Sequence, residues 1–156
     1  KKRIEKIISA NNLIEKYEIF KRYPSSLEIK IYQTKFLAYI KKDGANFLLG
    51  SNDKFIFTKN EVKKIPLVHG NFKNEDFKNF KNLIDETNFK FKEIKNLYFF
   101  PSGRWDMETY SGTLIRLPKN KLKEKIELSN IILKDNKFEN INLIDLRQEN
   151  QIIINE

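Results

Sequence analysis

The end of the chain, from Asn142 to Ile154, is the stretch that most constrains the fold. It reads Asn-Leu-Ile-Asp-Leu-Arg over 142–147 and Gln-Glu-Asn-Gln-Ile-Ile-Ile over 148–154. β-Branched residues favour strands, so we expect a sheet that ends on this strand. A final strand with one unpaired side is an edge for another chain unless Pro or Lys blunts it, and neither occurs after Lys137. A last strand that lies between two neighbours is the alternative interpretation of the same pattern.

The net charge of +9 is concentrated at the N-terminal end of the chain. Residues 1–42 hold 11 Lys and Arg against 4 Asp and Glu, whereas residues 43–156 hold 19 against 17. Nucleic-acid sites favour Arg and spread their charge along a phosphate backbone, but only five of the thirty cations are Arg. We therefore expect no nucleic-acid partner and favour attraction of this end to an anionic membrane surface. A nucleic-acid-binding module that uses Lys and aromatic residues remains an alternative function.

The sequence offers few groups for catalysis. It contains no Cys, which excludes disulfides, thiol catalysis and Cys-based zinc sites, and its one His, His69, is predicted to be a turn residue. Asp106 and Glu108 are expected to be solvated on an exposed strand face, and Trp105, which alternates with Met107, is expected in the core. No nucleotide-binding fingerprint or metal-ligand spacing occurs. We predict that the protein is not an enzyme and holds no cofactor or metal.

Hydrophobic spacing predicts a helix and a β-hairpin at the N-terminal end. Ile4, Ile7 and Ile8 lie at helical spacing, and this helix is expected to end near residues 11–12. From Tyr17 the period is two, with a turn over residues 24–26, and the side chains expected on one face are Tyr17, Ile19, Leu27, Ile29 and Ile31. So small a unit cannot bury both of its faces, and we expect the first elements of its domain to lie upstream.

The rest of the chain predicts a sheet with two helices. The helices are expected over residues 74–84, with Asn74 as the N-cap, and over residues 121–133. Further strands are expected over residues 47–49, 54–57, 94–100 and 143–147. Asp145 and Arg147 are two apart on the last of these, so they share a face and are expected to form a structural ion pair.

A hairpin is predicted from Arg104 to Pro118, and its loop length decides the register. A three-residue loop, 110–112, with Gly112 in the left-handed conformation places Met107 opposite Ile115 and Trp105 opposite Leu117. A two-residue loop places Met107 opposite Arg116 instead. We expect the three-residue loop, because it keeps the large apolar side chains on one face.

Five of these segments, taken in order, resemble the bacterial cell-division proteins of the FtsQ/DivIB family. Residues 22–24 and 27–31 are similar to the family pattern "R-x-W-P-x-T-L-x-I-x-V", with Tyr23 in the place of Trp. The turn that ends at Asp53 is similar to "D-x-x-G-x-x-F", and Asp53 stands where the family has Gly. The pattern "L-P-x-L-x-G" matches residues 65–70, "R-x-W-x-L-x-L" begins at Arg104, and "V-D-L-R" matches residues 144–147. The resemblance covers essentially the whole chain.

The resemblance implies an α+β fold in two parts. Residues 1–38 are expected to form the C-terminal portion of a POTRA-like domain, a helix plus a β-hairpin. Residues 39–156 are expected to form an FtsQ-type β domain, which is a mainly antiparallel sheet with two packed helices. It also implies a single-pass protein of the bacterial inner membrane, with its transmembrane helix upstream of Lys1 and this part in the periplasm.

The function implied is that of a non-enzymatic scaffold and regulator of the divisome during septum assembly. Its expected partners are FtsB and FtsL at the β domain and other divisome proteins at the POTRA part. We expect FtsB and FtsL to pair with the terminal edge strand, whose candidate residues are Arg147, Gln148, Glu149, Asn150, Gln151, Ile152, Ile153 and Ile154. A POTRA-containing transport or outer-membrane assembly factor is a further alternative.

Overall fold

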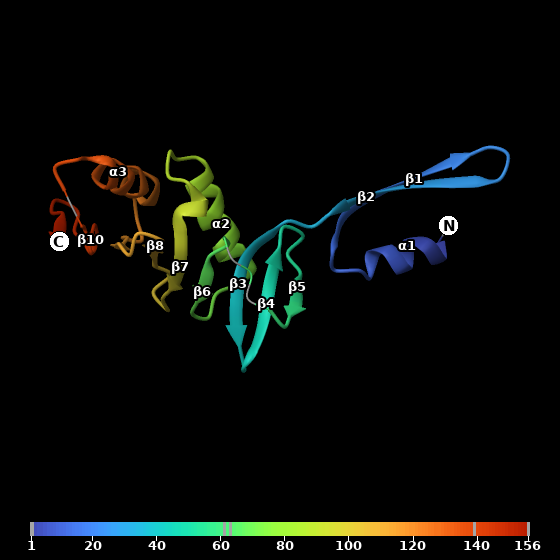
Figure 1. Cartoon of the computed structure of the whole chain (residues 1–156), viewed down its shortest axis with the longest axis horizontal. Coiled ribbons are helices and arrows are strands. Elements are labelled where there is room, and N and C mark those ends of the chain that lie inside the picture. Colours follow the sequence, from blue (N-terminus) through green and yellow to red (C-terminus); the bar gives the residue numbers. More distant parts are fainter. Residues whose placement is uncertain (1, 61, 63, 139, 156) are drawn as a thin grey trace. The chain divides into compact units, whose positions relative to one another are not determined.

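The computed structural model of the chain describes residues 2–60, 62, 64–138 and 140–155. Its elements fall into two units, Lys1–Val62 and Lys63–Glu156, which are coloured blue to green and green to red in Figure 1. Within the described ranges there are three α-helices, one short 3₁₀ turn and eleven strands. The class is α+β, as the sequence predicts.

The first unit begins with a helix and a β-hairpin. Helix α1 (Lys2–Ser9) buries Ile8, and it is followed by the antiparallel strands β1 (Ile14–Arg22) and β2 (Ser26–Gln33). Ile19 lies opposite Ile29 in the register, which confirms the face predicted from the period-two pattern.

Three antiparallel strands complete this unit in the order β3 (Phe36–Lys42), β4 (Ala45–Gly50) and β5 (Phe55–Thr58). Asp53 lies in the turn between β4 and β5 and has a φ of 61°, the left-handed conformation that Gly adopts most easily. The aspartate therefore occupies the backbone region that a glycine at this position would favour.

The second unit is a six-stranded mixed sheet. The strands follow one another across the sheet in the order β6 (Leu67–His69), β7 (Ile94–Phe99), β8 (Trp105–Thr109), β9 (Leu114–Arg116), β10 (Leu143–Asp145) and β11 (Ile153–Asn155). Antiparallel pairs join β7 to β8, β8 to β9 and β10 to β11, whereas β6 with β7 and β9 with β10 are parallel.

The hairpin of β8 and β9 has the predicted register. Met107 lies opposite Ile115, and the main-chain N–H of Thr109 donates to the carbonyl of Thr113 at 3.0 Å. The loop between them is three residues long and includes Gly112, whose φ of 95° only glycine adopts readily. Met107, Ile115 and Trp105 are all buried, so this face of the sheet is the core.

Two helices, α2 (Asn74–Asp85) and α3 (Leu122–Lys134), cover that face, as predicted. The Phe80 ring of α2 stacks on Trp105 at 4.9 Å between ring centroids, and Leu122 of α3 borders a groove of about 160 Å³ beside the same two rings. The N-cap of α2 is Lys73 rather than the expected Asn74.

A short 3₁₀ turn, η1 (Phe91–Glu93), follows α2 and leads into β7.

The terminal strand is shorter than the sequence predicts. Strand β10 ends at Asp145, residues 148–152 form a loop, and β11 folds back antiparallel to β10. Asp145 Oδ1 accepts the main-chain N–H of Arg147 at 3.1 Å, so that donor leaves the strand ladder. The polar run over 148–151 then favours a loop. The isoleucines at the end belong to a separate strand.

Candidate functional site

Strand β11 is the outermost strand of the second unit. Ile154 lies opposite Ile144 and Ile153 lies opposite Asp145, while the far side of β11 has no neighbouring strand in the described part of the chain. The side chain of Ile153 is 43% exposed, and so is that of Ile152. Main-chain groups on that far side are therefore available for pairing with another chain.

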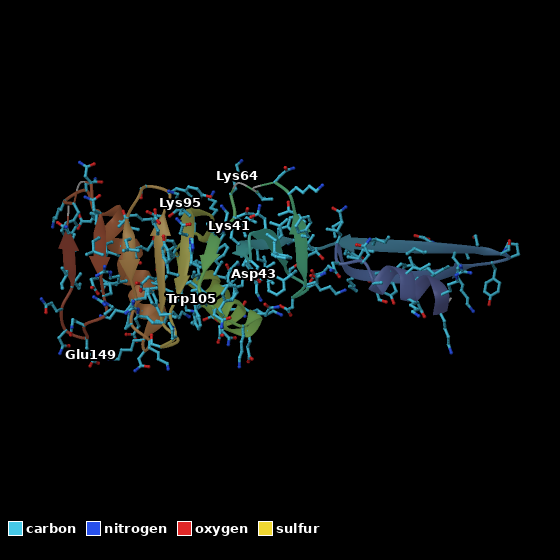
Figure 2. All side chains as sticks on the ribbon, turned by 90° about the horizontal axis from the view of Figure 1, so that it is seen from below. Lys41, Asp43, Lys64, Lys95, Trp105 and Glu149 are labelled. Atoms are coloured by element: carbon cyan, nitrogen blue, oxygen red, sulfur yellow. The ribbon has the colours of Figure 1, made fainter. Side chains whose placement is uncertain are left out.

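The predicted site residues are divided between a groove, a loop and this strand. Only Ile153 and Ile154 lie in β11. The loop that precedes it carries the exposed side chains of Gln148, Glu149, Asn150, Gln151 and Ile152. Glu149 projects from this loop at the outer end of the sheet (Figure 2). Glu149 therefore does not lie in the terminal strand as predicted, because β10 ends at Asp145 and β11 begins at Ile153.

Asp145 and Arg147 form the predicted ion pair. The guanidinium binds both carboxylate oxygens, with Nε at 2.9 Å from Oδ1 and Nη2 at 2.6 Å from Oδ2. Hydrogen bonding from Arg147 lowers the pKa of Asp145 from its ordinary value of 3.8, although burial of the carboxylate opposes this. Arg116 Nη1 lies 3.7 Å from the same carboxylate.

Asp106 forms a second buried carboxylate next to Arg104. It is only 3% exposed, Arg104 Nη2 lies 3.2 Å from Oδ2, and the Leu117 main-chain N–H donates to Oδ1 at 3.3 Å. Burial raises the pKa of Asp106 above its ordinary value, against the effect of Arg104. The prediction of a solvated Asp106 is therefore wrong, because arginine side chains cover this face of the strand.

Glu108 also differs from its predicted state, since it is half-buried and bound by neighbours. Asn96 Nδ2 and the Tyr98 hydroxyl donate to Oε2 at 2.8 and 2.9 Å. Burial opposes ionisation of Glu108, but these donors and Lys95 outweigh it and lower its pKa. Burial and the bond to Glu108 raise the pKa of Tyr98 to about 12. Together these groups form a fixed polar network.

Arg104, Arg116 and Arg147, which we call the arginine cluster, line one open groove of about 540 Å³. The Arg104 guanidinium lies 4.2 Å from the centroid of the Phe100 ring, and its Nε is buried without a hydrogen-bond partner in the described residues. The cluster carries three positive charges, and the carboxylates of Asp106, Glu108 and Asp145 lie beside it. The side chains of Arg116 and Arg147 nevertheless remain 38% and 41% exposed.

A second groove, of about 440 Å³, lies between the start of α3 and the loop before β11. Lys121 Nζ lies 2.7 Å from Glu149 Oε1, and Lys125 Nζ lies 3.4 Å from the Glu149 carbonyl. The Lys121–Glu149 pair is exposed, so it contributes little to stability. Arg104 and Arg147 border this groove too. The arginine cluster is thus continuous with the base of the terminal loop.

His69 does not lie in a turn as predicted, because it is the last residue of β6. Its ring stacks on Tyr98 at 4.8 Å between centroids, and Nε2 lies 3.4 Å from Asn96 Oδ1. Throughout the described ranges no group of three His, Asp or Glu side chains is arranged to hold a metal ion. His69 therefore packs with the polar network.

Sequence reasoning missed Arg104 and Arg116 as members of the site. Both lie on the face of the sheet opposite Trp105 and Met107, and the alternation of polar and apolar residues along β8 and β9 was the available signal. The alternation does not reveal that β10 lies parallel to β9, and it is this pairing that brings Asp145 next to Arg116.

An open sheet edge beside charged grooves is typical of domains that bind other proteins. The family model for the C-terminal part of the cell division protein FtsQ/DivIB matches residues 36–147, and the chain belongs to this family. The match ends at Arg147, so β11 lies beyond it. A comparison with curated proteins gives no match. In the described part of the chain, each helix is too short or too polar to cross a membrane.

Proposed function

We propose that this protein is a non-enzymatic scaffold and regulator of the divisome, and that it binds FtsB and FtsL through β11 by strand addition during septum assembly. Membership of the FtsQ/DivIB family supports the role in cell division over transport or nucleic-acid binding. Binding by strand addition is supported by the position of β11 as the outermost strand in the strand order. The resemblance to the family supplies the names of the partners.

Strand addition at β11 accounts for only part of the affinity. Each main-chain hydrogen bond is worth about 0.5 to 1.5 kcal/mol net, and β11 is three residues long. The partner must therefore also bury apolar surface or make charged contacts. Ile152 and Ile153 offer the apolar surface, since each is 43% exposed.

The arginine cluster favours an acidic side chain on the partner. The side chains of Arg116 and Arg147 are 38% and 41% exposed, and a guanidinium binds a carboxylate through two parallel hydrogen bonds. Arg147 joins the cluster to the loop that leads into β11, so a partner strand on β11 passes close to it.

The remaining features of the role follow from the family resemblance. We place this part of the protein in the periplasm, held by a single transmembrane helix upstream, with the POTRA-like residues 1–38 available to other divisome proteins. The exposed apolar side chains of the β1–β2 hairpin, including Leu27 and Ile31, support a binding role for that portion.

Proline substitution tests the edge-strand mechanism. Successive N–H groups of a strand point to opposite sides, so of Ile153 and Ile154 one donates toward β10 and the other points outward. Proline at the outward position removes a bond from the partner and none from the domain. We expect one of Ile153→Pro and Ile154→Pro to unfold cooperatively near the wild-type midpoint yet bind the FtsB/FtsL pair at least tenfold more weakly.

Gln151→Pro is the matched control, because Gln151 lies in the loop rather than in a strand. We expect it to change the affinity by less than about twofold. If both isoleucine variants stay folded and bind the FtsB/FtsL pair like the wild type, strand addition at β11 is wrong.

A further inference from the structure

A second sheet edge lies in the first unit of the chain. We propose that β5 (Phe55–Thr58) binds an extended segment of another protein by strand addition, and that this segment is apolar at alternate positions and acidic near its ends. Among the strands of the described residues, β5 stands at one end of the strand order, with β4 on its inner side (Figure 1). This site is separate from β11 and does not depend on the function proposed for that strand.

The register identifies which main-chain groups of β5 point outward. Phe57 lies opposite Phe47, and Phe55 lies opposite Leu49. The Gly50 N–H donates to the Lys54 carbonyl at 3.0 Å, so the main-chain groups of this position point across the hairpin. Because hydrogen-bonded and non-hydrogen-bonded pairs alternate, the N–H and C=O groups of Phe55 and Phe57 point away from β4.

A side-chain contact agrees with this assignment. Asn12 Nδ2 donates to the Phe55 carbonyl at 3.3 Å, from the side away from β4. The amide of Asn12 thus takes the place that the N–H of an added strand would occupy. In the described part of the chain, the main-chain groups of Phe57 make no such bond. A partner therefore has the Phe57 groups available and must displace Asn12 to use Phe55.

The side chains of β5 suit an apolar partner. Phe55 is 45% exposed and Phe57 is 60% exposed, and both lie on the same face of the strand because they are two residues apart. The Phe57 ring meets Phe47 edge-on, with 6.1 Å between centroids, which holds it beside the sheet. An added strand would place alternate side chains against these two rings.

Charge favours an acidic segment over a second copy of this chain. Lys54 and Lys59 lie at the two ends of β5, and no charged residue lies between them. Residues 1–62 carry 13 Lys and Arg against 7 Asp and Glu, a net charge of +6 for the first unit. Pairing two copies along β5 would bring two such units together, whereas acidic residues beside an apolar core complement both lysines.

Lys54 extends the basic surface toward helix α1. Its Nζ donates to the Ser9 carbonyl at 3.0 Å, which places the end of α1 beside the start of β5. Lys2, Arg3 and Lys6 of that helix are exposed. An acidic segment that extends past Phe55 would therefore meet further positive charge.

Selection from a library of random ten-residue peptides displayed on phage tests the proposal, with the whole chain as the target and Phe57→Pro as the counter-target. The variant loses one outward N–H, while Phe57→Leu keeps that N–H with a smaller apolar side chain. We expect a class of peptides with alternating apolar residues and acidic ends. Its members should bind the wild type at least tenfold more tightly than Phe57→Pro and within about threefold of Phe57→Leu.

Two further measurements use the folded protein directly. Asn12→Ala should tighten binding of the selected peptides by about threefold, because it frees the Phe55 carbonyl. Amide hydrogen exchange of Phe57 in the wild type should slow when a selected peptide is bound. This measurement tests strand addition at β5 even if Phe57→Pro unfolds. The proposal is overturned if no class of peptides depends on Phe57, if the class that does is basic, or if Phe57 is protected by self-association of the chain without peptide.

Discussion

Arg147 binds the carboxylate of Asp145, two residues before it, through its guanidinium and its main-chain N–H at once. The Nη2–Oδ2 distance is 2.6 Å and the N–Oδ1 distance is 3.1 Å. The side-chain bonds neutralise a carboxylate that is 5% exposed, and the main-chain bond ends β10. This pair therefore fixes the point at which the chain turns to form β11.

Acid unfolding tests the role of this pair. The folded-state pKa of Asp145 is below its ordinary value of 3.8, so its contribution to stability is present above that pH and is lost as the pH falls through the folded value. We expect the free energy of unfolding of wild type and Asp145→Asn, measured in urea titrations, to differ at about pH 6 and to converge as the pH falls below the folded-state pKa of Asp145.

Asp106→Asn provides a control of opposite sign. Burial raises the folded-state pKa of Asp106, so the wild type should lose stability relative to this variant as the pH rises through about 4 and up to the folded value. If the free energy of unfolding of both variants changes with pH in the same way as that of the wild type, neither carboxylate couples folding to protonation.

Trp105 is expected to be a major source of stability in the second unit. It is 4% exposed, and it packs against Phe80 and Phe99 with centroid distances of 4.9 and 4.8 Å. Trp105→Ala should lower the free energy of unfolding by about 3 to 5 kcal/mol. Tyr110→Ala, in the same hairpin but 53% exposed, should change it by about 0.5 kcal/mol or less. A loss below about 1 kcal/mol for the tryptophan variant would contradict its core role.

Local periodicity predicts most elements of this fold. The period-two segments give the β1–β2 hairpin with Ile19 opposite Ile29, and the single Gly112 is enough to select the loop that pairs Met107 with Ile115. Both features depend on residues close together in sequence. Composition and apolar spacing likewise predict α2 and α3, because their buried stripes are regular.

The end of the chain is where the sequence misleads. A run of β-branched residues indicates a strand but does not reveal that Asp145 captures the N–H of Arg147 and divides the run into two strands. The arginine cluster is missed for a related reason. Arg116 meets Asp145 only because β10 lies parallel to β9, across a connection that contains the whole of α3.

The basic N-terminal end should bind anionic membranes weakly. Lys2, Arg3 and Lys6 are exposed on α1, and Ile7 is 65% exposed. We expect association with vesicles that contain anionic lipid to fall steeply with salt, because the contact is between exposed charges. Changing all three basic residues to Ala should abolish it.

The same experiment separates the membrane from nucleic acid. Single-stranded nucleic acid of equal charge density should bind no better than the vesicles. Tight binding to nucleic acid that persists at about 0.2 M salt would count against a division role and favour a nucleic-acid-binding module.

Amide hydrogen exchange of β11, measured with and without the FtsB/FtsL pair, tests the central claim most directly. Strand addition protects only those N–H groups that point outward, so we expect exchange at either Ile153 or Ile154 to slow by at least tenfold in the complex. Phe57 of β5 should exchange at its free rate in the same samples. Unchanged exchange throughout Ile153–Asn155 in a sample where the FtsB/FtsL pair is bound would contradict the account.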